Sequence, residues 1–537
     1  MTFGLYAQDE WAVNEKLKLT LSLRMDRNAN PTCLNNCFAR MTSSFGTLTH
    51  DPTIPYNKAI NTGLRSAFPA TDWAVFQPRV GFSYAPQGQT GRMVLRGGIG
   101  LFSDLPPVTI VDSYLTNAPN VVNFTYSYAT AGGVPALLDP TLASGSAYGS
   151  LKSSATALTT GFASGQTLAQ IQAAVIAAGS KFSAPSFNSV ADTLHTPKVL
   201  EYNLETQFQL SHSDVIDFNF VGNRSWDGLM LNGLGNIRAK YGMAGLPSTQ
   251  PDTRFNIVSD LNNKNTANYN GLTTSFRHSA RFGLTMSANY TYSHALDLVS
   301  NGGLEAFNYQ ATYPQQQMNP TDVNKLNHGN ADYDIRHSSS FQYVWAVPYK
   351  PSNAILKTVG AGWSVSGNLF YRGGYPMSII NSSINTKQLN SQSTGTLLAA
   401  LVSGKDNNCS VKPDATDINN QVCFKGDSFA TVPSTSVYTY GFGNIARNSF
   451  RAPHYFNTDL QLNKETRVAE KFTVKMGANM FNVLNHANFS APANDAALSS
   501  TLGSITSTVT PPSSPYGSFM GSAVSGRVVQ MILSFSF

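Results

Sequence analysis

Four cysteines are the residues of this chain whose type and spacing come closest to a recognisable chemistry. They form two local pairs, Cys33 with Cys37 and Cys409 with Cys423. A zinc site needs more Cys or His ligands at suitable spacing, and the C-x3-C pair has no nearby His. The spacing therefore favours two small disulfides in exposed loops. Such bonds indicate an oxidising compartment.

One cluster of histidines and carboxylates resembles a metal site, since His328 and His337 flank Asp332 and Asp334. Such residues at the junction of a loop and a strand more often bind neighbouring side chains, and we expect that role here. The sequence contains no G-x-S-x-G, H-E-x-x-H or G-x-x-x-x-G-K-[ST] motif. The GGIG run at 97–100 lies inside a predicted strand, where glycine allows curvature or close packing. The sequence thus predicts no enzyme, no catalytic residue and no cofactor.

The composition excludes several classes of protein. Charged residues make up 12% of the chain, about half of the usual share of roughly 25%. The net charge of +6 comes from scattered Lys and Arg, which argues against nucleic-acid binding. No apolar run reaches the ~18 residues of a membrane-spanning helix. The start, MTFGLYAQDEW, lacks the basic and then apolar order of a signal peptide.

Segments of about ten residues with alternating polar and apolar side chains recur along the chain. Clear examples lie at 17–25, 200–210, 282–292 and 472–480. Such a period of two predicts strands with one apolar face. Strands in soluble sandwiches usually have about five or six residues, whereas about 9–11 residues match a tilted crossing of a bilayer.

Tight and long connections alternate between these segments. Tight ones lie at 13–15, 85–91, 211–213, 277–281 and 467–470, and long ones at 27–72, 104–197, 225–267, 293–336, 374–455 and 485–525. Compact soluble domains rarely carry loops beyond about 15 residues. Outer-membrane barrels combine short periplasmic turns with long extracellular loops. We therefore predict an all-β protein, an antiparallel transmembrane β-barrel, with one short helix near Leu168–Gly179 in the second long connection.

The predicted strands number thirteen. They lie at 3–13, 16–26, 73–85, 92–103, 198–211, 215–223, 268–278, 281–292, 337–348, 362–373, 456–466, 471–484 and 526–537. Bacterial single-chain barrels normally have an even number of strands. The odd number predicts that the chain is the C-terminal part of a larger barrel.

The last strand places four apolar side chains on one face, Met531, Leu533, Phe535 and Phe537. Terminal residues of soluble proteins usually fray, so an alternating strand that ends on phenylalanine needs another explanation. We expect this face to contact lipid.

Several motifs resemble TonB-dependent outer-membrane receptors of the Oar-like barrel type. In chain order they are YAQDEW at 6–11, LKLTLSLRMD at 17–26, QPRVGFSY at 77–84, VLRGGIGLF at 94–102, NYNGL at 268–272, NYTYSHALD at 289–297, YDIRH at 333–337, GNIARNSFRAP at 443–453 and FNVLNHANF at 481–489. The resemblance covers nearly the whole chain apart from its loops.

The resemblance implies that residues 1–537 form a partial receptor barrel in the cell outer membrane, with outer-membrane lipid around it. It also implies that the barrel assembly machinery recognises the terminal strand. The family's plug domain is not visible in the sequence, nor is the box that binds TonB, so TonB would act only through an N-terminal plug missing here. Large transporters of this kind have about 22 strands, which would leave roughly nine unaccounted for.

Uptake of a bulky extracellular ligand, such as a glycan, a peptide or a metal chelate, is the function that the resemblance implies. Three alternatives stay open from the sequence. They are a surface structural or adhesion barrel without transport, a diffusion porin, and a truncated receptor fragment without function. The genomic sequence before Met1 distinguishes among them, since an encoded plug would favour uptake.

Overall fold

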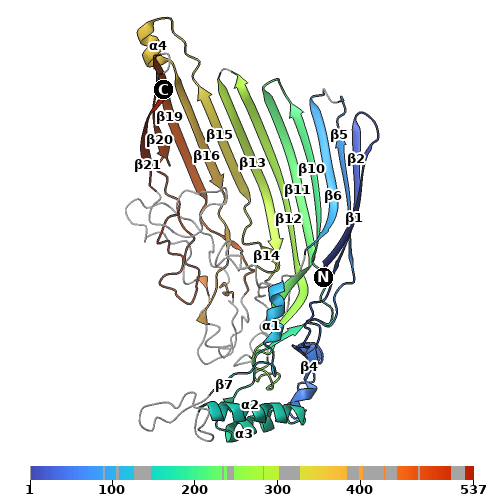
Figure 1. Ribbon diagram of the computed structural model, residues 1–537. Helices are drawn as coiled ribbons and strands as arrows, with labels where there is room; N and C mark the ends of the chain where they lie inside the picture. The colour runs from blue at the N-terminus through green and yellow to red at the C-terminus, as the bar shows by residue number, and fades with distance from the viewer. Residues whose placement is uncertain are drawn as a thin grey trace.

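In the computed structural model the chain forms a large curved β-sheet with a folded region at one end (Figure 1). The structure describes residues 2–88, 91–104, 108–125, 147–232, 235–238, 247–281, 283–300, 327–383, 398–402, 428–429, 444–469, 472–509 and 526–536. Within these ranges, no helix has the length and apolar character needed to cross a membrane.

The main sheet has fifteen strands, and all but β9 and β14 follow one another in sequence order, each antiparallel to the next. These consecutive strands are β1 (Thr2–Ala12), β2 (Leu17–Asn28), β5 (Val75–Tyr84), β6 (Met93–Ser103), β10 (Lys198–Gln209), β11 (Asp214–Asn232), β12 (Val258–Arg281), β13 (Leu284–Asp297), β15 (His337–Ala346), β16 (Trp363–Arg372), β19 (Tyr455–Ala469), β20 (Phe472–Phe481) and β21 (Val528–Ser536). The prediction of thirteen long antiparallel strands is confirmed.

The register gives the sheet one apolar and one polar face. Leu21 lies opposite Val80, which lies opposite Ile99. One residue along, Ser22 lies opposite Arg79. Because side chains alternate across a strand, rows of apolar residues and rows of polar residues run across neighbouring strands on opposite faces. We call these the apolar face and the polar wall.

The two ends of the sheet differ. The short connections, which join β1 to β2, β5 to β6, β10 to β11, β12 to β13 and β19 to β20, lie at one end, which we call the short-turn end. The C-terminal end of the chain lies there as well (Figure 1). The long connections lie at the opposite end. The sheet is open, with β1 and β21 as its edges in the part of the chain that the structure describes.

Two strands, β11 and β12, are much longer than the sequence predicted. The expected segments 215–223 and 268–278 are parts of β11 and β12, which have 19 and 24 residues. Their pairing continues past register shifts near Gly228 to Asn232 opposite Asp260. The prediction of a loop over 225–267 was therefore wrong at both of its ends. The irregular pairing interrupts the period of two, so the sequence pattern did not reveal the extension.

The long connections fold into what we call the loop region, namely the described residues within 29–74, 104–197, 235–257, 298–336, 373–454 and 482–527. Its strands are β3 (Phe38–Met41), β4 (Ile60–Leu64), β7 (Phe124–Thr125), β8 (Lys181–Phe182), β9 (Phe187–Val190), β14 (Gly329–Asn330), β17 (Pro376–Met377) and β18 (Phe450–Arg451). Its helical elements are η1 (Phe45–Thr47), η2 (Tyr56–Lys58), η3 (Val108–Val111), α1 (Asp112–Leu115), α2 (Ala147–Ala163) and α3 (Leu168–Ala177). Most of the buried apolar residues of the described chain lie here, including Ile171, Phe187 and Phe255.

Helix α3 confirms the helix expected near Leu168–Gly179. Thr167 caps it, because its side-chain oxygen accepts a hydrogen bond from the Gln170 N–H. The Gln170 side-chain oxygen in turn accepts a hydrogen bond from the Thr167 N–H. The four-residue helix α1 was missed, and so were two longer helices. They are α2, which packs beside α3 at the far end of the loop region (Figure 1), and α4 (Ala354–Gly360), which lies at the short-turn end.

Candidate functional site

The polar wall carries two hollows. One, of about 690 Å³, lies across β12 to β20, and its polar lining includes Arg277, Gln342, Asn368, Asp459 and Gln461. The other, of about 520 Å³, lies across β1 to β10, and its lining includes Glu10, Lys18, Arg96, Asn203 and Glu205. Side chains of both signs therefore line a concave surface that the alternating strands hold in place.

Neighbouring strands hold the charges of this wall together. Arg96 of β6 donates to Glu205 of β10, with Nη1 and Oε1 3.1 Å apart. Toward the loop region, the Asp26 carboxylate accepts from Arg24 Nε at 2.7 Å and from Gln77 Nε2 at 2.5 Å. Glu201, Glu205 and Lys475 also lie at polar-wall positions of the register. The wall is thus a polar surface, whose side chains are linked by hydrogen bonds and ion pairs, and it suits contacts with other polar groups.

A buried cluster around Arg447 joins the sheet to the loop region. The Arg447 side chain is 1% exposed and contacts the carboxylates of Asp297, at the end of β13, and Asp332. Its Nε donates to the Asn327 carbonyl at 3.0 Å, and its Nη1 donates to the Ser300 hydroxyl. A buried guanidinium with two carboxylates and further acceptors is the arrangement in which a buried charge is tolerated.

A second arginine cluster surrounds Asp334, which is fully buried. Arg336 Nε donates to Asp334 Oδ2 at 3.1 Å, and Arg451 also donates to this oxygen. The other oxygen accepts the backbone N–H of Ala295 in β13 at 2.6 Å. Arg451 belongs to β18, so Asp334 ties β18 to the end of the sheet. We call the Arg447 and Asp334 clusters together the arginine latch.

The latch explains the acidic cluster seen in the sequence. Asp332 accepts from Asn448 Nδ2 at 2.6 Å and faces Arg447, while Asp334 binds two arginines. His337 instead contacts Tyr290, whose hydroxyl lies 2.7 Å from its Nδ1. The carboxylates of Asp332 and Asp334 therefore form ion pairs with arginine side chains. No group of three or more His, Cys, Asp or Glu side chains that could hold a metal occurs among the described residues.

Another buried ion pair stabilises the loop region itself. Arg254 and Asp252 are both buried, with Nη2 and Oδ2 2.8 Å apart. His50 Nδ1 lies 3.2 Å from the same carboxylate oxygen. Burial opposes ionisation of Asp252, yet hydrogen bonds from the Arg254 side chain and backbone and from His50 lower the pKa of this carboxyl below its ordinary value.

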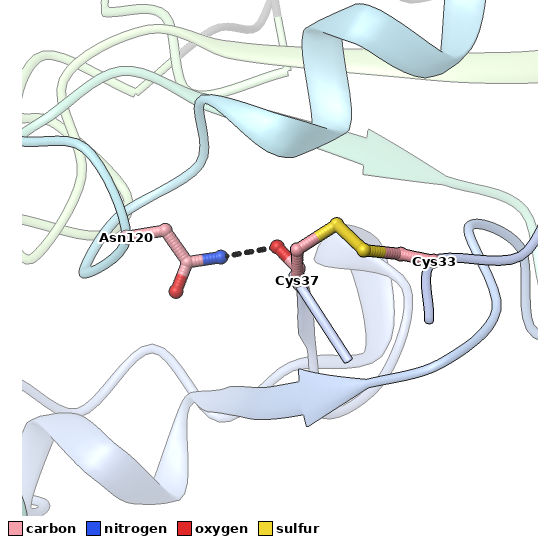
Figure 2. The surroundings of a disulfide bond; sticks show 3 residues. All are labelled: Cys33, Cys37 and Asn120. Carbon is pink, nitrogen blue, oxygen red and sulfur yellow. Dashed lines mark hydrogen bonds between the residues drawn. A yellow bond between two sulfur atoms is a disulfide. The ribbon is translucent and has the colours of Figure 1, made fainter. Parts of the chain in front are cut away.

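The structure describes one of the two cysteine pairs. A disulfide joins Cys33 to Cys37, whose Cα atoms are 5.8 Å apart, and Asn120 Nδ2 donates to the Cys37 carbonyl at 2.7 Å (Figure 2). Both cysteines pack against a buried cluster of the loop region. Cys409 and Cys423 lie outside the described residues, so their pairing stays a prediction.

The terminal strand places its apolar residues as the alternation requires. Met531 lies opposite Ala478, Leu533 opposite Met476 and Phe535 opposite Val474, all on one face. Met531, Leu533 and Phe535 are exposed, and Phe535 stacks on Phe472 with ring centroids 6.0 Å apart. Phe537 lies outside the described residues.

The sequence did not reveal that the arginine latch assembles from three separate motifs. Asp297 ends NYTYSHALD, Asp334 lies in YDIRH, and Arg447 and Arg451 lie in GNIARNSFRAP. Arg447 and Asp297 are 150 residues apart in the chain. Each motif was visible alone, but no local spacing indicates that they meet.

Comparison with known families identifies the family of this chain. Residues 1–530 match the model of the outer membrane beta barrel domain. No curated protein matches the chain.

Solved structures with a similar arrangement include three bacterial outer-membrane proteins. The outer membrane transporter YddB from Escherichia coli has a TM-score of 0.45 and 10% identity, and the match covers 100% of this chain and 45% of that one. The siderophore receptor PirA from Pseudomonas aeruginosa has a TM-score of 0.34, 9% identity and coverage of 90% and 45%. The ferric-catecholate import receptor Fiu from E. coli has a TM-score of 0.37, 9% identity and coverage of 100% and 44%. The chain therefore spans less than half of the length of each.

Proposed function

The chain belongs to the outer membrane beta barrel domain family, and from this premise we propose that it is the barrel portion of a receptor that takes up a bulky extracellular ligand. Its location is the cell outer membrane. The long connections are then extracellular and the short turns periplasmic, as in other outer-membrane barrels. The apolar face contacts lipid, and the polar wall faces the inside of the barrel.

The observation that carries this proposal is the polar wall with its two hollows. A wall that only had to hold loops at the surface would not need charged side chains of both signs along its concave side. Such a lining suits a polar ligand or a polar domain inside the barrel. The chemical class of the ligand, whether a glycan, a peptide or a metal chelate, follows from the family resemblance and is part of the proposal.

Energy coupling belongs to the same proposal. We propose that TonB acts on this receptor through a plug domain that contacts the polar wall, and that the Oar-like barrels are its relatives. The genomic sequence before Met1 is where such a domain is to be sought. The proposed assembly partner is the barrel assembly machinery, which would recognise Met531, Leu533, Phe535 and Phe537 on the terminal strand.

A surface adhesion barrel is the second candidate, because the loop region has buried apolar clusters of its own. A folded extracellular region can bind a partner without passing anything through the wall. In that case the hollows of the wall would be unimportant for function.

Uptake by intact cells separates these candidates. Cells with and without the full-length protein would receive three probes, a fluorescein-labelled oligosaccharide, a fluorescein-labelled peptide and a radioiron catecholate chelate. We expect one probe to accumulate, and a protonophore to abolish the accumulation. Surface binding without accumulation would favour adhesion, and accumulation unaffected by the protonophore would favour a diffusion porin.

A further inference from the structure

The connection between β15 and β16 departs from the other short turns. It spans residues 347–362 and contains α4, which Asn353 caps by accepting hydrogen bonds from the N–H groups of Ile355 and Leu356. In Figure 1 this helix stands at the short-turn end of the sheet, beside the C-terminal end of the chain. A bare turn would suffice to join the strands, so the helix calls for an explanation.

In the part of the chain that the structure describes, the helix has an exposed apolar side. Ile355, Leu356 and Val359 are 74%, 51% and 64% exposed. At 100° per residue they share one side of the helix, while Lys357 lies on the opposite side. Three large apolar side chains exposed together on so short a helix indicate a surface that another apolar phase covers.

The end of the helix is held from the apolar face of the sheet. Trp363 begins β16 on that face, in the alternating series with Val365 and Leu369, and its Nε1 donates to the Val359 carbonyl at 2.9 Å. Lys464 lies opposite Trp363 in β19. Its ammonium donates to the Ala361 carbonyl at the C-terminal cap of the helix, where the helix dipole favours a positive charge.

Aromatic rings and charge complete the pattern of a membrane interface. The Tyr349 ring lies against Gly360, where an added Cβ would come within 2.7 Å of Cε1. Tyr349 and Trp363 thus flank the helix, and Tyr and Trp are enriched at the headgroup level of membranes. Residues 347–362 contain Lys350 and Lys357 and no acidic residue, so they complement the anionic headgroups of phospholipids.

We propose that α4 is an interfacial anchor, which inserts Ile355, Leu356 and Val359 into the periplasmic leaflet of the outer membrane. The partner is the phospholipid surface, because the helix is attached to the face that already contacts lipid. The proposal requires the outer-membrane location but not the uptake of a ligand. Interfacial helices of this kind bury their apolar side about 5–10 Å into the boundary between headgroups and acyl chains.

Fluorescent labels on opposite sides of the helix test this proposal. Ile355→Cys and Lys357→Cys would be made separately in full-length protein with Cys409→Ser and Cys423→Ser. Each would be labelled with the dye NBD in nanodiscs of phosphatidylethanolamine and phosphatidylglycerol. We expect nitroxide-labelled lipid to quench the label at 355 severalfold more than the label at 357, and aqueous iodide to show the reverse order.

Heat-modifiable migration in gels would verify that each labelled variant is folded, and the exposure of both positions makes folding of the variants the expected result. If iodide quenches the label at 355 as strongly as the label at 357, the proposal is overturned. That outcome would make a periplasmic protein the better candidate for the partner. Failure of ligand uptake by the parent protein would leave this result unchanged.

Discussion

The sheet and the loop region of this protein are built on opposite plans. In the sheet, large apolar side chains such as Leu21 and Ile99 stay exposed on one face, and backbone pairing with neighbouring strands holds them in place. In the loop region, Ile171 and Phe255 are completely buried with other apolar side chains. The first region depends on lipid as its apolar solvent, whereas the second has an interior like that of a soluble domain.

The arginine latch lies where the two plans meet. Arg447 and Asp334 are buried charged residues at the end of the sheet. Their partners come from β13 on one side and from the segments at 327–336 and 444–451 on the other. The loops are thus fastened to the sheet by these ionic contacts as well as by apolar clusters that include Met230 of β11 and Val258 and Leu261 of β12.

The latch gives the largest expected effect. Arg447→Gln should destabilise the attachment of the loop region by about 3–5 kcal/mol, because it leaves buried carboxylates without their charge partner. Arg96→Gln, at a half-exposed ion pair of the polar wall, should cost only about 0–1 kcal/mol. Limited proteolysis of the loops in folded barrels would measure both, and equal protease resistance of the two variants would show that the latch does not fasten the loops.

The next largest effect is expected from removing an isoleucine side chain, and its size should differ between the loop region and the sheet. Ile171→Ala removes a fully buried side chain and should destabilise the loop region by about 2–5 kcal/mol. Ile99→Ala acts at a side chain that is 50% exposed on the apolar face and should change little in a bilayer, because lipid is as apolar as the side chain. Thermal unfolding in nanodiscs provides the comparison. A larger loss for Ile99→Ala would mean that the sheet has a packed protein core on that face.

A smaller effect is expected from pH. The pKa of Asp252 is lower in the folded protein than its ordinary value of 3.8. Its carboxylate therefore stabilises the loop region above that pH, and the contribution is lost as the pH falls through the lower folded pKa. Protease resistance of the loops should decline below pH 3.8 while heat-modifiable migration of the sheet persists. A simultaneous loss of both would show that this pair does not act on the loop region alone.

The smallest direct effect on folding is expected at the chain end. Phe537→Asp should cost only about 0–1 kcal/mol near the membrane interface, so that folding in detergent changes little. Assembly in cells should fall much more, because recognition of the terminal strand would be impaired. Ser536→Asp, on the other face of β21, is the control. The amount of heat-modifiable protein in outer membranes is the readout, and equal amounts of both variants and the parent would rule out this terminal signal.

The strands of the sheet could be predicted from the sequence because the two faces of the sheet contact different solvents, and this difference determines which residue types alternate along each strand. Lipid on one side and water on the other impose a strict period of two, as in 17–25, and long connections separate the segments. The pattern therefore gave thirteen strands in the correct order. It missed the outer halves of β11 and β12, where both faces lie within the loop region and a bulge breaks the period.

The latch and the anchor helix could not be derived in the same way. Arg447 finds Asp297 across 150 residues, and nothing in the local pattern of either segment encodes that encounter. Helix α4 is too short for a periodic signal, although Asn353 before an apolar run is typical of a helix start. Long-range polar contacts and short helices therefore require the structure.

The central claim is that the sheet separates lipid from water by alternate side chains. A spin-label scan across β2, from Leu17 to Asp26, tests it most directly in full-length protein with Cys409→Ser and Cys423→Ser in nanodiscs. Contact with dissolved oxygen, which concentrates in lipid, should peak at the odd-numbered positions. Contact with a water-soluble nickel chelate should peak at the even-numbered ones. Labels that the nickel chelate reaches equally on both faces would contradict the account.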